Sequence, residues 1–355
     1  MSVLDKNVGV IGCGGISRFH FSGLRKAGAC VKWVCDLSEQ AARPWAEQFG
    51  ARYTADYRDI IADATVRVVD VTAVSSAHKA ICLTAIEAGK AVICEKTLAE
   101  NAADALQIVQ AAVRKKTIFY TSYMKRFIPA MEKAKELLPS LGRILSTHIR
   151  AHQCWGDLWS KSPSGGIFHA PAGGASVVRS RYGGGILVCG GSHILDLVLF
   201  FLARPRRLFA SMHTPVGMDC DVQAAVLMET GNGTVLFEAL AHPLTRVGFL
   251  RDGWDERVEI NGVNGRLDIY SSAWDQVDAK ASMLVHYDNA TGAATEYRYD
   301  PVSPFDRAMA FFCGNIERGV QGEQSPLTGY EVDNLISHIN RSAELKQAVE
   351  VQWQI

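Results

Sequence analysis

The chain has 355 residues, of which 48% are hydrophobic and 21% are charged. At ~150 residues per domain this length suggests two domains, and the composition predicts a stable globular core. Lysine plus arginine and aspartate plus glutamate each number 37, so no overall field would attract nucleic acid or acidic lipid, and the expected partner is a small molecule. The apolar runs are far shorter than the ~20 residues of a membrane helix, and the first residues lack the basic and apolar regions of a signal peptide. We therefore expect a cytoplasmic protein.

Nine cysteines are scattered along the chain without a CxxC pair. An odd number without a pattern argues against a disulfide framework or a zinc site. Cys35, Cys82 and Cys94 fall in apparent strands or buried helices. We therefore expect reduced thiols that pack as small hydrophobic side chains, and no metal site.

Short β-branched runs alternate with helical patterns over residues 7–121. The runs are VGVIG, VKWVC, VRVVDV, AVIC and IFYTS, and the expected helices cover residues 16–26, 38–49, 77–88 and 102–114. Strands that alternate with helices of ~10–15 residues are typical of βαβ units. The nearly continuous apolar strands indicate burial on both faces. This part of the chain is therefore predicted to form an α/β fold with a parallel, doubly wound sheet.

A glycine-rich turn, GVIGCGGIS, joins the first expected strand to the first helix. Gly12 permits the tight turn and Gly14 lets the backbone approach a pyrophosphate, which rests on the helix N-terminus formed by Gly15, Ile16 and Ser17. Ser17 stands where the third glycine of GxGxxG would be, so the pattern gains its weight from its position between strand and helix. The alternative is that the glycines serve packing alone. We interpret the turn as a dinucleotide-binding site.

Asp36 ends the second expected strand. A carboxylate at this place accepts both ribose hydroxyls of NAD and repels the 2′-phosphate of NADP. Leu37 follows, where a phosphate-binding arginine would otherwise stand. The sequence therefore predicts NAD as the cofactor in preference to NADP.

Glu95 and Lys96 close the strand AVIC. They lie at the carboxyl edge where open α/β sheets bind ligands. From spacing alone, a solvated charge pair at a strand end explains them equally well.

Five features occur in an order and spacing that resemble one protein family. They are GVIGCGGIS, Asp36, HKAICLTAIEAGKAVICEK, YMKRFIPAM and GGSHILDL. Over essentially the whole chain they resemble the Gfo/Idh/MocA family, which is named after glucose-fructose oxidoreductase, inositol dehydrogenase and rhizopine catabolism. The resemblance implies an N-terminal Rossmann domain, residues 1–122, and a C-terminal α/β domain with an open, mostly antiparallel sheet, residues 123–355. It also implies NAD(P)-linked oxidation or reduction of a sugar or cyclic polyol at a site between the domains.

The resemblance assigns roles to individual residues. Lys96 matches the lysine of the family's Glu-Lys-Pro motif, which contacts the nicotinamide ribose and the reacting hydroxyl. His193 matches the proton-relay histidine, so Lys96 and His193 are the expected catalytic residues. Arg126 matches a basic residue near cofactor and substrate, and His78 matches a helix-start histidine for which packing is the alternative. The other residues expected at the cofactor or substrate are Thr72, Ala73, Glu95, Trp155 and Cys189.

Three departures from the family pattern bear on the chemistry. Thr97 replaces the motif's proline, and a cis bond before a residue other than proline costs about 3 kcal/mol. Ala73-Val74 replaces a threonine-proline pair. Cys189 replaces the family's aspartate four residues before His193, and a thiol with an ordinary pKa of ~8.5 holds a negative charge less readily than a carboxylate. The standard proton relay is therefore in question.

His193 lies in an expected helix over residues 190–202. On that helix Cys189, His193 and Asp196 would share one face, so that Asp196 orients the imidazole toward substrate. The alternatives are a histidine satisfied within the core and a cysteine nucleophile at Cys189 paired with His193.

The second domain is expected to contain further strands and two long loops. The strands are ILSTHIRAHQ, AAVLMETGNGTVLFEAL, RVEINGVNGRLDIY and SMLVHYD, and a helix over residues 330–348 is expected to pack near the first domain. The loops, 155–185 and 242–256, supply tryptophans for stacking on a sugar and the arginines Arg179, Arg181, Arg246 and Arg251 for binding an anionic group. Solvated loop charges are the alternative for each arginine.

Together these patterns predict an NAD-dependent dehydrogenase of a sugar, glycoside or cyclic polyol. Two alternatives are an NAD-dependent glycoside hydrolase that oxidises, eliminates and re-reduces its substrate, and a non-catalytic sugar or redox sensor. The open sheet of the second domain predicts a homodimer or homotetramer. The sugar, the reacting carbon and the direction of the reaction are not encoded in these motifs.

Overall fold

The chain is divided into two compact units, each built from two separate stretches of sequence. The first unit combines Met1–Met124 with Phe305–Asp333, and the second combines Lys125–Pro304 with Asn334–Ile355. The structure, a computed structural model, describes residues 6–159, 184–216, 218–276 and 279–355.

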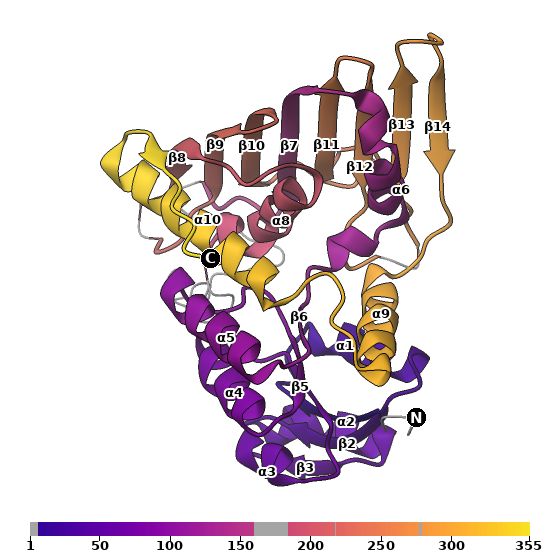
Figure 1. Cartoon of the computed structure of the whole chain (residues 1–355), viewed down its shortest axis with the longest axis vertical. Helices are drawn as coiled ribbons and strands as arrows, with labels where there is room; N and C mark the ends of the chain where they lie inside the picture. Colours follow the sequence, from indigo (N-terminus) through magenta and orange to yellow (C-terminus); the bar gives the residue numbers. More distant parts are fainter. Residues whose placement is uncertain (1–5, 160–183, 217, 277–278) are drawn as a thin grey trace. The chain divides into compact units, whose positions relative to one another are not determined.

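The first unit is built on a parallel sheet of six strands in the order β3-β2-β1-β4-β5-β6 (Figure 1). The strands are β1 (Asn7–Ile11), β2 (Cys30–Cys35), β3 (Arg52–Thr54), β4 (Val68–Val71), β5 (Ala91–Cys94) and β6 (Phe119–Thr121). The helices are α1 (Ser17–Lys26), α2 (Glu39–Phe49), α3 (Tyr57–Ala62), α4 (Ser75–Glu87), α5 (Ala102–Lys115), α9 (Pro304–Arg318) and the first part of α10 (Pro326–Leu345). The predicted parallel, doubly wound sheet is confirmed, with β3 and α3 as additions to the elements named from the sequence.

Helices cover both faces of this sheet, which is why its strands are so apolar. One face packs against α3, α4 and α5 in an aliphatic core. Gly9 of β1 allows α3 to approach, because a Cβ there would lie 2.2 Å from the side chain of Ile60. On the other face aromatic rings stack in pairs, namely Phe21 with Trp45, Phe19 with Phe305 and Tyr120 with Phe312. The carboxyl ends of the strands remain as the edge where such sheets bind ligands.

The limits of two helices follow from local capping signals. Ser38 accepts a hydrogen bond from the Ala41 N–H at the start of α2, and Gly50 ends that helix with a φ of +61°. Asn101 accepts a hydrogen bond from the Asp104 N–H at the start of α5. These side chains satisfy N–H groups that the helix leaves unpaired.

The second unit is built on a sheet of nine strands in the order β14-β13-β12-β11-β7-β10-β9-β8-β15. They are β7 (Ile144–Cys154), β8 (Arg207–His213), β9 (Gln223–Thr230), β10 (Gly233–His242), β11 (Trp254–Gly262), β12 (Gly265–Ser271), β13 (Met283–Asp288), β14 (Ala294–Arg298) and β15 (Val349–Glu350). Neighbouring strands are antiparallel except for β7 and β10, which are parallel. The predicted open, mostly antiparallel sheet is therefore confirmed.

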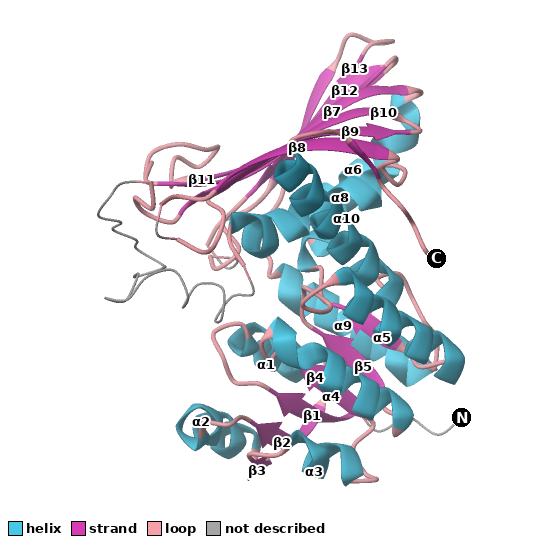
Figure 2. Cartoon of the chain, turned by 90° about the vertical axis from the view of Figure 1, so that its left-hand side faces the viewer, coloured by secondary structure: helices cyan, strands magenta, loops and turns pink. Residues whose placement is uncertain are grey.

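The two faces of the nine-stranded sheet differ in what covers them (Figure 2). Helices α6 (Pro129–Leu137), α8 (Ser192–Phe201) and the C-terminal part of α10 lie on one face. Three short turns, η1 (Met124–Phe127), η2 (Leu138–Leu141) and η3 (Leu187–Gly191), connect or extend these helices. On the outer face the side chains of Phe209, Leu227 and Leu236 are 44%, 42% and 45% exposed. Among the described residues, this outer face has no helix over it.

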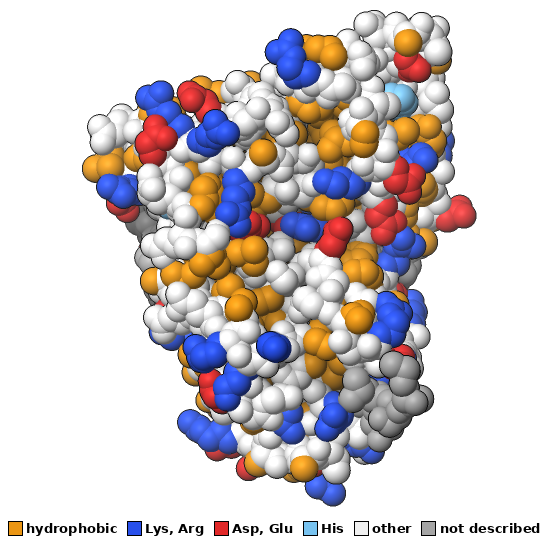
Figure 3. All heavy atoms as spheres, viewed as in Figure 1, with side chains coloured by type: hydrophobic (Ala, Val, Ile, Leu, Met, Phe, Trp, Pro, Cys, Tyr) orange, Lys and Arg blue, Asp and Glu red, His pale blue; other side chains and the backbone are white. Residues whose placement is uncertain are grey.

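The surface carries both signs of charge. On the face shown in Figure 3, Lys and Arg side chains are interspersed with Asp and Glu side chains. None of the helices within the described ranges combines the length and the apolar composition that spanning a bilayer requires.

Candidate functional site

The glycine-rich turn after β1 packs closely against the loop after β4. Gly12 has a φ of +102°, and a Cβ there would lie 2.5 Å from the Ala73 nitrogen and 2.6 Å from the Thr72 carbonyl carbon. The Thr72 hydroxyl donates a hydrogen bond of 2.6 Å to the Gly12 carbonyl oxygen. By contrast, Gly14 and Gly15 are exposed, and no described atom lies within 4 Å of a Cβ added to either. The side of the turn at Gly12 therefore packs against protein atoms, whereas the side at Gly14 and Gly15 is open to a ligand.

The first turn of α1 lies next to these open glycines. Ile16, in the N-cap position, makes no side-chain capping hydrogen bond. The Ser17 hydroxyl donates a hydrogen bond of 2.7 Å to the Gly14 carbonyl oxygen and so fixes the turn. N–H groups at a helix N-terminus attract phosphate. The open glycines and the uncapped helix start thus fit the pyrophosphate of a dinucleotide.

Asp36 follows β2 beside the same turn. Its Oδ2 accepts a hydrogen bond from the Cys13 N–H and its Oδ1 accepts one from the Ser38 N–H, each at 2.8 Å. These bonds fix the carboxylate at the end of the strand, and each oxygen keeps lone-pair capacity for a ribose hydroxyl. Leu37 is 92% exposed. The arrangement fits the adenosine ribose of NAD.

Glu95 and Lys96 follow β5 at the same edge of the sheet. Glu95 is 5% exposed, and its Oε2 accepts a hydrogen bond of 3.1 Å from the Lys96 N–H. Its Oε1 lies 2.9 Å from Nε2 of His20 on α1. The other ring nitrogen of His20 lies 2.9 and 3.1 Å from the two carboxylate oxygens of Asp70 on β4. A buried chain of Asp70, His20 and Glu95 therefore links β4 and α1 to the strand end that carries Lys96.

The members of this chain set one another's protonation. Burial by itself lowers the pKa of His20, but the charge of Asp70 and hydrogen bonds to Asp70 and Glu95 outweigh burial and raise the pKa to about 10. Burial by itself raises the pKa of Glu95, but the hydrogen bond and charge of His20, and then the charge of Lys96, leave it lowered. At neutral pH a protonated imidazole thus stands between the two carboxyl groups. His20 and Asp70 were not among the predicted site residues. The signal that could have identified them is a polar residue on the apolar side of a helix, for His20, and within an apolar strand, for Asp70.

His78 occupies the first turn of α4 and is 1% exposed. Its Nδ1 lies 2.9 Å from the Thr97 carbonyl oxygen, and its Nε2 lies 2.9 Å from the Ala73 carbonyl oxygen. Burial lowers the pKa of His78 against the effect of these carbonyl groups. The ring therefore ties the loop after β4 to the loop after β5, where the Lys96–Thr97 peptide bond is cis. This placement agrees with the packing alternative for His78.

A further carboxylate of the first unit, Asp333 on α10, also acts electrostatically on this region. Its Oδ2 accepts a hydrogen bond of 2.9 Å from the Ala99 N–H. Burial raises the pKa of Asp333 well above its ordinary value, and the Ala99 N–H and the charge of Lys96 oppose that rise. Asp333 was also missed, because it comes from the returning part of the chain and has no local motif.

In the second unit, His193 lies in the first turn of α8 and is half-buried. The expected helix over residues 190–202 is observed as Ser192–Phe201, because the segment before it, η3, forms one turn of π-helix. Cys189 lies within η3, and its thiol sulfur is 3.6 Å from the Gly184 carbonyl oxygen. A π-helical turn is an uncommon departure from α-helical geometry that frequently occurs at functional sites.

The buried carboxylate of Asp221 holds the start of η3. Its Oδ2 accepts a hydrogen bond of 2.8 Å from the Leu187 N–H, and its carbonyl oxygen accepts one of 3.0 Å from the Ile186 N–H. Gly185 lies so close that a Cβ there would be 2.1 Å from the Asp221 carbonyl oxygen. Burial raises the pKa of Asp221 to about 6, against the effect of the Leu187 N–H and other backbone groups. Asp221 was not among the predicted site residues.

Arg126 forms a bidentate ion pair with Asp196 of α8. The Arg126 Nε donates to both Asp196 oxygens at 3.1 and 2.9 Å, and Nη2 donates to Oδ1 at 2.6 Å. The Asp196 side chain is 0% exposed and that of Arg126 is 12% exposed. Both oxygens of the Asp196 carboxylate, which was predicted to orient His193, thus accept hydrogen bonds from Arg126. A guanidinium matches a carboxylate in this planar, two-point geometry.

Trp155 belongs to a second buried polar network. Lys125 forms an ion pair with Glu256, and their side chains are 3% and 1% exposed. The Gln153 amide donates to Glu256 at 2.9 Å, and the Trp155 indole N–H donates to Gln153 at 3.0 Å. Trp155 is 3% exposed, so this structure places it among protein groups. Gly190 contacts the same network, since a Cβ there would lie 2.5 Å from the Gln153 amide nitrogen.

Only some of the loop residues that were expected near the substrate lie within the described residues. Arg246 and Arg251 are exposed between β10 and β11, and Arg251 has a φ of +53°. Trp159 stacks on His213 with ring centroids 4.8 Å apart. Arg179 and Arg181, with most of the loop over residues 155–185, lie outside the described residues. Within the described ranges no group of three or more His, Cys, Asp or Glu side chains is placed to hold a metal ion.

The structure brings the predicted residues together in two sets. In the first unit, the cofactor set follows the carboxyl ends of neighbouring strands and comprises Gly12, Gly14, Gly15, Ile16, Ser17, Asp36, Thr72, Ala73, His78, Glu95 and Lys96. In the second unit, the set comprises Arg126, Trp155, Cys189 and His193, which lie in or beside η1, β7, η3 and α8.

Two protein-family models match the chain. Residues 6–123 match the oxidoreductase family with an NAD-binding Rossmann fold, and residues 131–268 match the Gfo/Idh/MocA C-terminal domain. The chain is also 29% identical over 282 residues to inositol 2-dehydrogenase 2 of Saccharopolyspora erythraea, a match that covers 76% of this chain and 75% of that protein. A shorter match to an inositol 2-dehydrogenase of Burkholderia multivorans has 36% identity over 153 residues, 41% of this chain and 45% of that protein.

Solved structures share the whole fold. An oxidoreductase domain protein from Kribbella flavida has a TM-score of 0.82 at 22% identity, covering 98% of this chain and 99% of that chain. Levoglucosan dehydrogenase in complex with NADH and levoglucosan has a TM-score of 0.81 at 22% identity, with the same coverage. At 22% identity, the likeness to these two structures is one of fold alone.

Proposed function

Because the chain belongs to the Gfo/Idh/MocA family of NAD-binding oxidoreductases, we propose that it is a dehydrogenase of a sugar, glycoside or cyclic polyol that uses NAD in preference to NADP. The names of the similar proteins, inositol 2-dehydrogenase and levoglucosan dehydrogenase, support this substrate class. A cytoplasmic location stays a prediction.

The observation that carries the proposal is the position of Lys96. It follows β5 at the sheet edge that also carries the open glycine turn and Asp36, next to a Glu95 whose carboxylate is fixed on both oxygens. NAD, when bound there, supplies the acceptor for a hydride from the substrate's secondary alcohol. We propose that Lys96 takes the proton of that alcohol and that His193, as the family resemblance implies, assists at the reacting hydroxyl. A positioned base contributes ~10²–10⁴ in rate.

Lys96→Ala should abolish hydride transfer and leave NAD binding intact, since the glycine turn and Asp36 are untouched. We expect kcat to fall at least ~10²-fold, measured by NADH absorbance with a panel of sugars, inositols and glycosides. Lys32→Ala, which removes an exposed lysine from β2 of the same sheet, is the matched control and should keep its activity. A Lys96→Ala enzyme that retained most of its rate would show that the strand-end lysine is structural. Release of aglycone without net NADH would instead support the glycoside hydrolase alternative.

Asp36→Ser should weaken the preference for NAD. Loss of the carboxylate removes hydrogen bonds to the ribose and repulsion of a 2′-phosphate, so the ratio of kcat/KM for NAD to that for NADP should fall ~10-fold or more. Lys32→Ala, on the exposed side of β2 away from the strand end, serves as the control and should keep the ratio. Equal or faster turnover of the unaltered enzyme with NADP would refute the cofactor preference.

The variants His193→Ala and Cys189→Ser should differ strongly in kcat. If His193 acts on the reacting hydroxyl, its loss should lower kcat at least ~10²-fold. Cys189 is proposed to fill space where relatives place a carboxylate, so Cys189→Ser and Cys189→Ala should retain substantial activity and resist thiol reagents. If Cys189→Ser were as inactive as His193→Ala, with fold and NAD binding intact, the thiol would have to take part in the chemistry.

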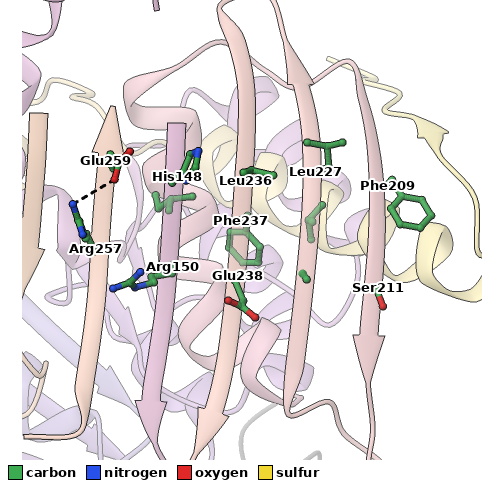
Figure 4. A pocket seen from close by; sticks show the side chains of 13 residues that line it. His148, Arg150, Phe209, Ser211, Leu227, Leu236, Phe237, Glu238, Arg257 and Glu259 are labelled. Carbon is green, nitrogen blue, oxygen red and sulfur yellow. Dashed lines mark hydrogen bonds and ion pairs between the residues drawn. The ribbon is translucent and has the colours of Figure 1, made fainter. Parts of the chain in front are cut away.

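The outer face of the nine-stranded sheet is proposed to bind a second copy of the chain. Figure 4 shows a pocket on this face, whose lining runs from Phe209, Leu227 and Leu236 on β8, β9 and β10 across β7 to the charged side chains of Arg257 and Glu259 on β11. Contiguous exposed apolar side chains of this kind mark interaction surfaces. Leu227→Glu should shift the protein toward monomers in light scattering, whereas Val113→Glu on the exposed side of α5 should not. A monomeric unaltered protein at micromolar concentration would contradict the proposed dimer or tetramer.

A further inference from the structure

Asp36, the residue proposed to bind the adenosine ribose, is held at three of its atoms. Its two carboxylate oxygens accept hydrogen bonds from the Cys13 and Ser38 N–H groups, each at 2.8 Å. Its carbonyl oxygen accepts a hydrogen bond of 3.3 Å from the hydroxyl of Tyr53, which lies 17 residues further along the chain. The first two donors belong to the backbone. Tyr53 therefore supplies the side chain of this set whose replacement can alter the position of Asp36.

We propose that Tyr53 is a positioning residue for Asp36, which holds the Asp36 carboxylate in its place at the ribose and thereby adds to the preference for NAD over NADP. The inference rests on the proposed role of Asp36 in the choice of cofactor. It assigns a part in that choice to a strand residue that belongs to no nucleotide-binding motif and that contacts Asp36 directly.

The register of the strands brings Tyr53 to this place. β3 is the edge strand of the parallel sheet and pairs with β2, so that Tyr53 lies opposite Val34 and Thr54 lies opposite Cys35. Asp36 follows Cys35 directly at the end of β2. A tyrosine side chain is long enough to reach from its own position on β3 to this strand end, and the hydrogen bond to the Asp36 carbonyl oxygen is the result.

The hydrogen bond from Tyr53 restrains the peptide that follows Asp36. Leu37 is 92% exposed, so packing of its side chain does not fix this peptide. The Asp36 carbonyl group turns with the ψ dihedral of Asp36, because the peptide bond itself is planar. A donor bound to the carbonyl oxygen therefore limits that rotation. Since the carboxylate is attached to the same Cα atom, its orientation toward a ribose depends on the backbone that Tyr53 helps to hold.

The Tyr53 hydroxyl is a hydrogen-bond donor at neutral pH. Burial raises the pKa of Tyr53 above its ordinary value, and the charges of Glu39 and Asp36 add to this rise, whereas the charge of Arg43 opposes it. Glu39 and Arg43 lie on α2 and form an ion pair with each other. Because a carbonyl oxygen can only accept, a hydroxyl that keeps its proton is the matching partner.

Tyr53→Phe keeps the aromatic ring and removes the hydroxyl alone. We expect the Kd for NAD to rise ~5-fold, the effect of one lost hydrogen bond, measured by calorimetry without substrate. The Kd for NADP should stay the same or fall, because a carboxylate that can turn away repels a 2′-phosphate less. A role for Tyr53 in stability alone would lower the melting temperature and leave the ratio of the two Kd values unchanged. Tyr57→Phe, at another half-buried tyrosine of the first unit, is the matched control and should leave both Kd values in place.

A double-variant cycle tests whether Tyr53 acts through Asp36. If it does, the hydroxyl should matter only while the Asp36 carboxylate is present. In the Asp36→Ser background, Tyr53→Phe should therefore change the Kd for NAD by less than ~2-fold. Melting temperature is recorded for each variant, so that a loss of fold is separated from a loss of nucleotide affinity.

Three results would overturn the proposal. One is an unchanged Kd for NAD in Tyr53→Phe. Another is equal weakening of NAD and NADP binding in that variant. The third is the same loss of NAD affinity with and without the Asp36 carboxylate. An unchanged ratio of NAD to NADP use in Asp36→Ser would instead refute the proposed role of Asp36, and an active Lys96→Ala enzyme would refute the proposed base and leave the nucleotide affinities as they stand.

Discussion

A charged side chain that leaves water needs a partner of opposite charge, and this constraint organises both units of the chain. In the first unit it is met by His20 between Asp70 and Glu95. In the second it is met by the pairs Arg126 with Asp196 and Lys125 with Glu256. Breaking such a buried pair by removing one member costs about 3–5 kcal/mol. Each pair therefore fixes the elements that carry it and, with them, the neighbouring residues proposed to act on cofactor and substrate.

The parts of the fold that could be predicted are those with local signals. Local patterns of a few residues indicate the β-branched strands, the glycine turn and the strand-end position of Asp36. The parallel sheet and its ligand-binding edge follow from these patterns. For the second half, the residues predicted only strands separated by turns, and the open, mostly antiparallel sheet was implied by the family resemblance. These signals hold because hydrophobic period and backbone geometry act over short stretches.

The partners of the site residues could not be predicted in the same way. His20 and Asp70 reach Glu95 only because α1 and β4 meet beside β5, and the sequence separations are 75 residues for His20 with Glu95 and 50 for His20 with Asp70. Arg126 pairs with Asp196 from 70 residues earlier in the chain, and no local pattern indicates that pairing. The π-helical turn before His193 depends on Asp221, which holds it from a later part of the chain.

The return of residues Phe305–Asp333 to the first unit has a consequence for synthesis. The chain begins with its nucleotide-binding motifs, but the face of α1 that carries Phe19 stacks on Phe305, and Ser22 bonds to Asp306 across 284 residues of sequence. The backbone of Phe119 in β6 bonds to the side chain of Gln321 across 202 residues. During synthesis on the ribosome, these surfaces of the first unit have no partners until most of the second unit has been made. The first unit, whose N-terminal part is made early, can therefore complete its packing only late in synthesis. Contacts of such long range in sequence make this step a slow one in folding.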